Sequence, residues 1–119
     1  MVGETAHEVY LKTFFPGATM RSVPDLAAAE AALRGGEVDY VFADGLGLAL
    51  WIGGTEAGGC CAFAGGSYLE SRFFGEGIGF VFRPEDELLR RAFDFALHRL
   101  WEEGKYAEIY LRFFPISPF

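Results

Sequence analysis

Long apolar runs are missing from this chain of 119 residues. A helix that crosses a bilayer needs about 20 predominantly apolar residues. The longest candidate stretch, residues 45–54, is shorter than this and contains several glycines. Met1 leads directly into Val2-Gly3-Glu4, without the basic and apolar regions of a secretion signal. We therefore expect neither a membrane-spanning helix nor a signal peptide in this sequence.

Basic residues are also few. Ten Lys and Arg stand against 17 Asp and Glu, which gives a formal net charge of −7. An acidic surface of this kind repels the phosphate groups of nucleic acids and of anionic lipids. The composition therefore argues against nucleic acid and against an anionic membrane surface as partners.

Cysteine is limited to the adjacent pair Cys60 and Cys61. Adjacent cysteines rarely bond to each other, because a disulfide has a specific geometry. We therefore expect two half-buried thiols on a strand. A metal site needs more clustered ligands than this chain offers, so the sequence predicts no metal and no cofactor.

Recognisable catalytic motifs are absent as well. The glycine-rich stretch 75–79 precedes a predicted strand rather than a helix, so it lacks the context of a phosphate-binding loop. Ser67 has no nucleophile-elbow context. His7 and His98 lie far apart, each on a predicted helix; a catalytic pairing of the two stays open, although solvated or packed histidines are the more common case. The sequence thus predicts a protein that is not an enzyme.

Apolar residues, in contrast, make up 51% of the sequence, as in a folded domain or a fragment of one. The β-branched and aromatic stretch 38–44 predicts a strand buried on both faces, which is typical of a parallel sheet. The residues before it, 25–34, predict a helix that Gly35 and Gly36 end. A helix, a turn and a buried strand together indicate an α/β unit.

The remaining elements follow from turn residues, helix caps and hydrophobic spacing. Val2-Gly3 is predicted to be the last part of a strand. Further strands are predicted at residues 18–23, 38–44, 60–64 and 77–83. Helices are predicted at residues 6–14, 25–34, 45–52, 84–103 and 105–113, with an irregular connection at 68–74. The helix 84–103 is apolar around much of its circumference, so we expect it to be buried on more than one side.

Two helix starts are the candidate ligand site. Thr5 and Ala6 begin the first helix, and Glu8 follows Thr5 at the spacing of a capping box. Free N–H groups at such a start can bind a carboxylate. Asp44 lies at the carboxyl end of a predicted strand, where α/β sheets bind ligands, and its carboxylate suits a cation. The pair suits a zwitterion such as an amino acid, although each residue could equally be an ordinary helix cap.

A series of short motifs along the chain carries a family resemblance. In order, these are Gly3-Glu4-Thr5-Ala6-His7-Glu8-Val9-Tyr10-Leu11, Pro24-Asp25-Leu26, Ala32-Leu33-Arg34-Gly35-Gly36-Glu37-Val38-Asp39, Phe42-Ala43-Asp44, Phe74-Gly75-Glu76-Gly77-Ile78-Gly79, Arg83-Pro84-Glu85-Asp86-Glu87-Leu88 and Gly104-Lys105-Tyr106-Ala107-Glu108-Ile109-Tyr110. With them the chain resembles the polar amino-acid solute-binding proteins of ABC uptake systems, which are type II periplasmic binding proteins (bacterial extracellular solute-binding protein family 3). No single motif is very specific, but the series runs in the right order over nearly all of the chain.

The resemblance implies an α/β fold that represents only the C-terminal half of such a protein. Residues 1–74 would form part of ligand-binding lobe two, a three-layer sandwich. Residues 75–119 would supply the crossover strand and the C-terminal helices of lobe one. The N-terminal part of lobe one, with further ligand-binding residues, is missing from the chain.

The resemblance also implies roles for the site residues. Family members usually show Gly-Thr-Thr where this chain has Glu4-Thr5-Ala6, so Thr5 is kept, while the glycine and the second hydroxyl are lost. Thr5 and Ala6 would hold the ligand carboxylate, and Asp44 would bind the ligand ammonium. Asp39 falls on a structural position.

The implied partners are a polar or basic amino acid and, for the full-length protein, an ABC transporter permease in the periplasm. Two alternatives stay open. One is an enzyme similar to the cyclohexadienyl dehydratases of the same fold, with Glu4 as the extra acid. The other is a truncated protein without a ligand that self-associates, because the helix 84–103 would lack its cover; we expect a homodimer of this fragment.

Overall fold

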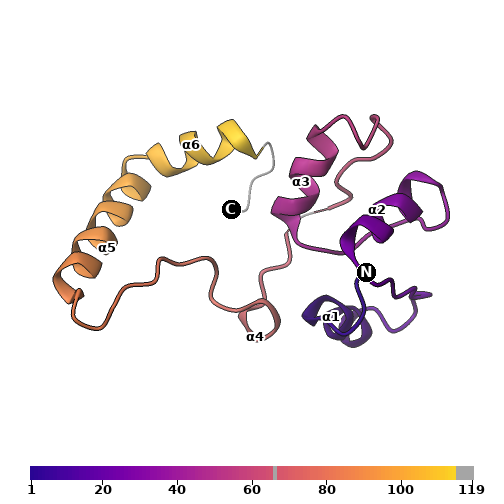
Figure 1. Ribbon diagram of the computed structural model, residues 1–119, viewed down its shortest axis with the longest axis horizontal. Coiled ribbons are helices and arrows are strands. Elements are labelled where there is room, and N and C mark those ends of the chain that lie inside the picture. Colours follow the sequence, from indigo (N-terminus) through magenta and orange to yellow (C-terminus); the bar gives the residue numbers. More distant parts are fainter. Residues whose placement is uncertain (66, 115–119) are drawn as a thin grey trace. The chain divides into compact units, whose positions relative to one another are not determined.

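The computed structural model describes residues 1–65 and 67–114 and forms two compact units, which divide between Glu76 and Gly77 (Figure 1). The first unit contains the helices α1 (Ala6–Phe14), α2 (Leu26–Arg34), α3 (Gly45–Gly53) and α4 (Ser71–Phe74). The second contains α5 (Glu87–Glu102) and α6 (Lys105–Phe113). The assignment of residues 1–74 and 75–119 to two lobes stays a prediction.

Side-chain caps begin two of the predicted helices. The Asp25 carboxylate accepts a hydrogen bond of 2.8 Å from the Ala28 N–H, and the Asp44 carboxylate accepts one of 2.8 Å from the Gly47 N–H. Each bond satisfies a helix-start N–H that has no partner within the helix. Gly36, with a φ of 71°, turns the chain after α2. The predicted helices 25–34 and 45–52 are therefore confirmed as α2 and α3.

The start of α1 differs from the predicted capping box. The Thr5 hydroxyl donates to the Val2 carbonyl at 2.8 Å instead of accepting from the helix. The Glu8 carboxylate accepts from the Glu4 N–H at 2.8 Å, one residue further back than a capping box requires. Both bonds fasten the segment that enters α1, and Glu4 sits there with a φ of 56°, in the left-handed region that favours glycine.

The predicted α/β three-layer sandwich is wrong. Within residues 1–65 and 67–114 there is no strand, and the stretches 18–23, 38–44, 60–64 and 77–83 form no ladder. A single parallel bridge pairs Val2 with Val23. Bonds from the Gly3 N–H to the Val23 carbonyl and from the Val23 N–H to the Met1 carbonyl, both 3.0 Å, hold it.

The physical reason lies in what a strand requires. β-branched and aromatic residues favour a pleated surface only where neighbouring strands and packing partners complete it. In the stretch 38–44, Tyr40 is 76% exposed, so the predicted burial on both faces does not occur. The alternating pattern therefore indicated which side chains prefer burial and not which backbone groups pair. No ladder of backbone hydrogen bonds forms in the described residues.

An aromatic cluster forms one core of the first unit. At its centre is Tyr10 of α1, which is only 3% exposed. Its ring stacks on Phe42 with centroids 5.5 Å apart and meets Phe74 of α4 at 5.1 Å. The other rings in contact with Tyr10 belong to Phe14, Phe15, Tyr68 and Phe73. The cluster thus ties α1 to the segment before Asp44 and to the short helix α4, in a stretch that was predicted to be irregular.

A second core lies around α2 and α3. It consists of small and medium apolar side chains that are less than 10% exposed: Ala29, Ala32, Leu48, Ala49, Trp51 and Ala57. Trp51 has the largest side chain of this set and is 9% exposed. This core holds α3 and the turn after it.

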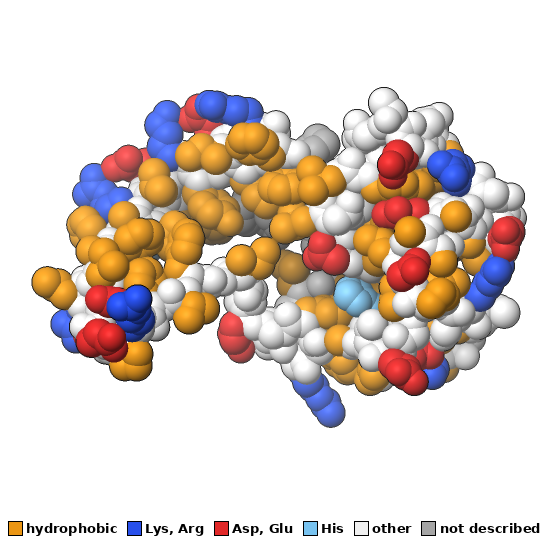
Figure 2. Space-filling view, in the orientation of Figure 1, with side chains coloured by type: hydrophobic (Ala, Val, Ile, Leu, Met, Phe, Trp, Pro, Cys, Tyr) orange, Lys and Arg blue, Asp and Glu red, His pale blue; other side chains and the backbone are white. Residues whose placement is uncertain are grey.

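The second unit consists of amphipathic helices. Ion pairs line one side of α5, including Arg99 with Glu103 at 2.7 Å. Apolar side chains gather on the other side, as Figure 2 shows over α5 and α6. Phe80 and Phe82 pack on Phe93 with centroids 5.5 and 5.3 Å apart. No described residue from 77 to 114 is buried, so the predicted burial of this helix on several sides does not occur within the single chain.

None of the helices in the described part of the chain has the length and hydropathy that a bilayer-spanning helix needs.

The left-handed backbone at Glu4 gives a first prediction. Glu4→Gly should raise the free energy of unfolding by about 0.5–1 kcal/mol, because the relief of about 1–2 kcal/mol of steric cost exceeds the entropy that glycine loses on folding. Gly36→Ala is the matched control: a Cβ there meets open space, but its φ of 71° is unfavourable, so this change should destabilise the protein. Urea denaturation measures both, and a loss of stability in Glu4→Gly would contradict the prediction.

Candidate functional site

The start of α1 presents Ala6 to solvent, with Thr5 half-buried beside it. The Thr5 carbonyl accepts the first bonds of the helix, from the N–H groups of Glu8 at 3.1 Å and Val9 at 3.3 Å. The N–H groups before Glu8 have no carbonyl to reach within the helix, which is the usual property of a helix start. Such groups, with the positive end of the helix dipole, favour an anion at Thr5 and Ala6.

Asp44 combines two properties. Its Oδ2 accepts from the Gly47 N–H, so the residue is the N-cap of α3. The side chain is also exposed, and a carboxylate can accept several hydrogen bonds, so a ligand ammonium can share it with the cap. The two interpretations of Asp44 from the sequence, a cap and a cation-binding group, are compatible in this geometry.

His7 follows Ala6 on α1 and packs on residues near Asp44, and the sequence reasoning did not assign it to the site. Its ring contacts Phe42 at 5.7 Å and Phe74 at 5.3 Å. Partial burial lowers the pKa of His7 from its ordinary value of 6.5, the Asp44 carboxylate acts in the opposite direction, and the N-terminal ammonium adds to the lowering. His7, one residue after Ala6, therefore lies within electrostatic reach of Asp44.

The sequence did contain a signal for His7. A residue three positions before Tyr10 shares its helix face, so the ring that stacks on Phe42 brings His7 toward residues 42–44. That inference required knowledge that Tyr10 packs on Phe42, which only the tertiary structure supplies.

A shallow hollow of about 390 Å³ adjoins the start of α1. Its lining residues come from the entry to α1 and from the segment around the parallel bridge: Gly3, Glu4, Glu8, Ser22, Val23 and Pro24. Glu8 organises its polar part, because it accepts hydrogen bonds from the Glu4 N–H at 2.8 Å and from the Ser22 hydroxyl at 2.9 Å, and pairs with Lys12 at 2.9 Å. Glu4 also lines the hollow and is exposed.

In the described part of the chain, no three His, Cys, Asp or Glu side chains come together in a way that could hold a metal ion. Cys60 and Cys61 form a disulfide with each other, so the expectation of two thiols on a strand is wrong. A turn closed by the Cys60 N–H and the Ala57 carbonyl precedes the pair, and residues 60–64 form no strand.

Comparison with known proteins gives two similar relatives. The L-arginine-binding protein of Pseudomonas aeruginosa is 35% identical over 82 residues, which cover 69% of this chain and 32% of that protein. The lysine/arginine/ornithine-binding periplasmic protein of Escherichia coli K12 is 31% identical over 85 residues, which cover 71% of this chain and 33% of that protein. The chain thus spans about a third of the length of each relative. No family model matches the chain, and no solved structure matches it significantly.

The two relatives support the resemblance to solute-binding proteins for polar amino acids. Both are described as binding proteins and neither as an enzyme, which agrees with the absence of catalytic motifs. The similarity is partial and distant, so it supports the class of protein rather than a ligand for this chain.

The network at Glu8 gives a prediction for acid stability. Hydrogen bonds from Lys12, the Glu4 N–H and Ser22 lower the pKa of Glu8 from its ordinary value of 4.5 to about 2. Because the folded-state pKa is the lower one, the stabilisation is fully present above about pH 4.5 and is lost as the pH falls toward about 2. Glu8→Gln should remove this part of the acid dependence. Urea midpoints measured by circular dichroism between about pH 5 and pH 2 test it.

Lys12→Met provides the matched comparison for Glu8. It removes the largest cause of the lowered pKa, so the loss of stability on acidification should be smaller than in the unmodified chain and complete at a higher pH. Identical acid profiles for the unmodified chain and both variants would show that Glu8 contributes nothing to this transition.

Proposed function

We propose that this chain is part of a solute-binding protein for a polar or basic amino acid. Asp44 binds the α-ammonium group of the ligand, and the start of α1 at Thr5 and Ala6 binds the α-carboxylate. The observation that carries the proposal is the stacking of Tyr10 of α1 on Phe42, two residues before Asp44, in a chain whose two relatives are described as binding arginine, or lysine, arginine and ornithine.

The charges of the site support this ligand class. The helix start offers N–H groups to an anion, and Asp44 offers exposed carboxylate oxygens to a cation. The net charge of −7 attracts a ligand with an additional positive side chain, such as arginine or lysine. His7, whose ring contacts Phe42 at 5.7 Å, would contact the ligand backbone.

The hydroxyl of Thr5 makes a smaller contribution than the family pattern implies. It donates to the Val2 carbonyl, so its role toward a ligand carboxylate would be indirect, through the position of the backbone N–H groups. Ala6 contributes only its N–H group, because it has no hydroxyl. We therefore assign the carboxylate site to the backbone at the start of α1.

The whole protein would act as the receptor of an ABC uptake transporter and would deliver the ligand to its permease in the periplasm. A disulfide between Cys60 and Cys61 fits an oxidising compartment of this kind. The chain covers about a third of each relative, so the remaining ligand contacts would come from protein outside this sequence.

An amino-acid titration by calorimetry tests the proposed site. The chain alone should bind L-arginine or L-lysine with a dissociation constant of roughly millimolar or weaker, since it offers only part of the contacts. Asp44→Asn should weaken this binding by about 1–3 kcal/mol, the range for a lost charged partner. Ligand-observed NMR can measure dissociation constants that are too weak for calorimetry.

Asp25→Asn is the matched control for Asp44→Asn. Both aspartates are helix N-caps with the same bond of 2.8 Å to an N–H three residues on, but only Asp44 belongs to the proposed site. The two changes should alter stability to a similar extent, while binding falls only in Asp44→Asn. Equal affinity in both variants would mean that Asp44 is only a cap.

We further propose that the chain forms a homodimer through α5. Its apolar side includes Leu89, Phe93 and Leu100, which are 48%, 40% and 36% exposed. Full burial of one such side chain stabilises a protein by about 1.5–3 kcal/mol, and a continuous apolar surface of this kind is uncommon on a monomer. A second copy offers the same surface, so a two-fold arrangement would cover both.

Sedimentation at micromolar concentration tests the dimer. The unmodified chain should sediment as a dimer, and Leu100→Lys should shift it to the monomer, because a charge cannot be buried at the apolar contact. His98→Lys places the same charge on the ion-paired side of α5, next to Glu102, and should leave the dimer intact. A monomer of 13.1 kDa in the unmodified chain would exclude the dimer.

A further inference from the structure

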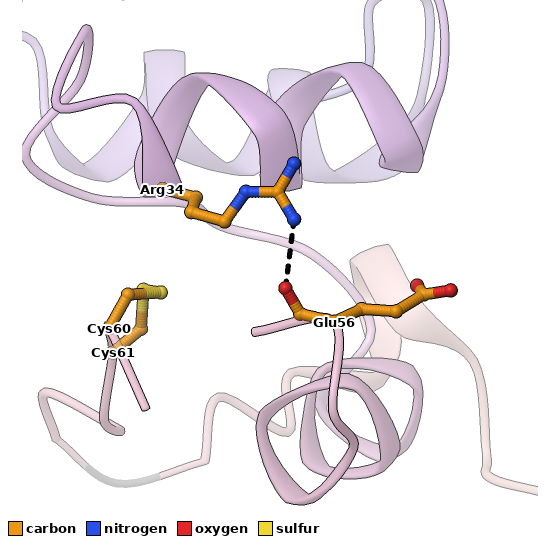
Figure 3. The surroundings of a disulfide bond; sticks show 4 residues. All are labelled: Arg34, Glu56, Cys60 and Cys61. Atoms are coloured by element: carbon orange, nitrogen blue, oxygen red, sulfur yellow. Dashed lines mark hydrogen bonds between the residues drawn. A yellow bond between two sulfur atoms is a disulfide. The ribbon is translucent and has the colours of Figure 1, made fainter. Parts of the chain in front are cut away.

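The disulfide between Cys60 and Cys61 lies in the connection between α3 and α4, outside the proposed ligand site (Figure 3). Adjacent cysteines close a small ring that contains one peptide bond, so the disulfide constrains the backbone of only two residues. It joins no distant segments and closes no long loop, unlike a disulfide that stabilises a fold through the unfolded state. Its effect must therefore be local.

The turn before the disulfide is fixed to the second core. Ala57 is 1% exposed, and the Arg34 guanidinium of α2 donates to the Glu56 carbonyl at 2.8 Å. The Cys60 N–H donates to the Ala57 carbonyl at 3.1 Å and closes the turn. Gly58 and Gly59, with φ of 60° and 70°, take the left-handed conformations that this tight path requires.

The chain after the disulfide leads to the aromatic cluster. Tyr68 contacts Tyr10 and Phe42, each with ring centroids 5.5 Å apart. The disulfide therefore lies between two anchored points, Ala57 in one core and Tyr68 in the other. In this position, a constraint on two residues sets the direction in which residues 62–65 leave the turn.

We propose that Cys60 and Cys61 form a reversible thiol–disulfide switch, which reacts with a dithiol and sets the path of residues 57–65. Cys60 is exposed and Cys61 half-buried, so a thiol from solution can reach the bond. Exposed disulfides are the ones that take part in exchange reactions. This inference does not depend on the proposed ligand.

The exchange proceeds in two steps. A thiolate of the dithiol attacks one sulfur of the Cys60–Cys61 bond, forms a mixed disulfide and releases the other cysteine as a thiolate, which takes up a proton. The second thiol of the reductant then attacks the mixed disulfide, closes its own disulfide and releases the remaining cysteine. Two electrons and two protons pass from the dithiol to the protein, and a disulfide oxidant reverses the reaction.

Hydrogen exchange measured by mass spectrometry on the full chain, with and without dithiothreitol, tests the switch. The oxidised chain should carry an intramolecular disulfide and no free thiol. Reduction should add two hydrogens and speed amide exchange in residues 59–65 by roughly threefold or more, because the released backbone opens locally. Exchange in α5 should stay unchanged, and reoxidation should restore the original pattern.

The double variant with Cys60→Ser and Cys61→Ser is the control, since serine keeps the size and polarity of a reduced cysteine. It should show the fast exchange of residues 59–65 in both conditions and no response to dithiothreitol. If this variant does not fold, the comparison of the unmodified chain with and without dithiothreitol still tests the proposal. Free thiols in the air-oxidised chain, a disulfide between two chains, or equal exchange before and after reduction would each overturn it.

Discussion

The stacking of Tyr10 on Phe42 is the contact on which the candidate site depends. It joins α1 to the segment that ends at Asp44, with ring centroids 5.5 Å apart and an angle of 9° between the rings. Because Tyr10 is nearly fully buried, the position of α1 relative to residues 42–44 is well determined. His7 lies one helical turn before Tyr10 and is thereby held within electrostatic reach of Asp44. Aromatic packing, rather than a sheet, thus fixes α1 against the segment that precedes Asp44.

The polar contacts at the entry to α1 complement this packing. The Glu8 carboxylate accepts hydrogen bonds from the Glu4 N–H and the Ser22 hydroxyl and pairs with Lys12. The bond to Ser22 joins the start of α1 to the segment of the parallel bridge. Glycine would adopt the left-handed backbone found at Glu4 at a lower steric cost than glutamate does. The entry to α1 therefore combines a strained residue with a network that stabilises it.

Local sequence signals predicted the helices well. Asp25 and Asp44 predicted the starts of α2 and α3 because an aspartate cap acts on an N–H only three residues away. Hydrophobic spacing also indicated α5 and α6. The strand predictions were wrong because a strand does not depend on local residues alone. The pattern at 38–44 indicates which side chains prefer burial, whereas a strand needs backbone partners from distant segments. Two other stretches that were predicted as strands, Val2-Gly3 and residues 18–23, do find such a partner in the parallel bridge between Val2 and Val23.

The sequence by itself determined the aspartate caps of α2 and α3, the amphipathic character of the C-terminal helices and the acidic charge of the chain, since each depends on neighbouring residues or on composition. The family resemblance, which two relatives support, also came from the order of short motifs. Only the tertiary structure decided that Tyr10 packs on Phe42 and that the Thr5 hydroxyl and the Glu8 carboxylate both fasten the segment that enters α1. It also decided that Cys60 bonds to Cys61. These contacts depend on how the chain folds back on itself, because side-chain packing and turn geometry are properties of three-dimensional neighbours rather than of sequence spacing.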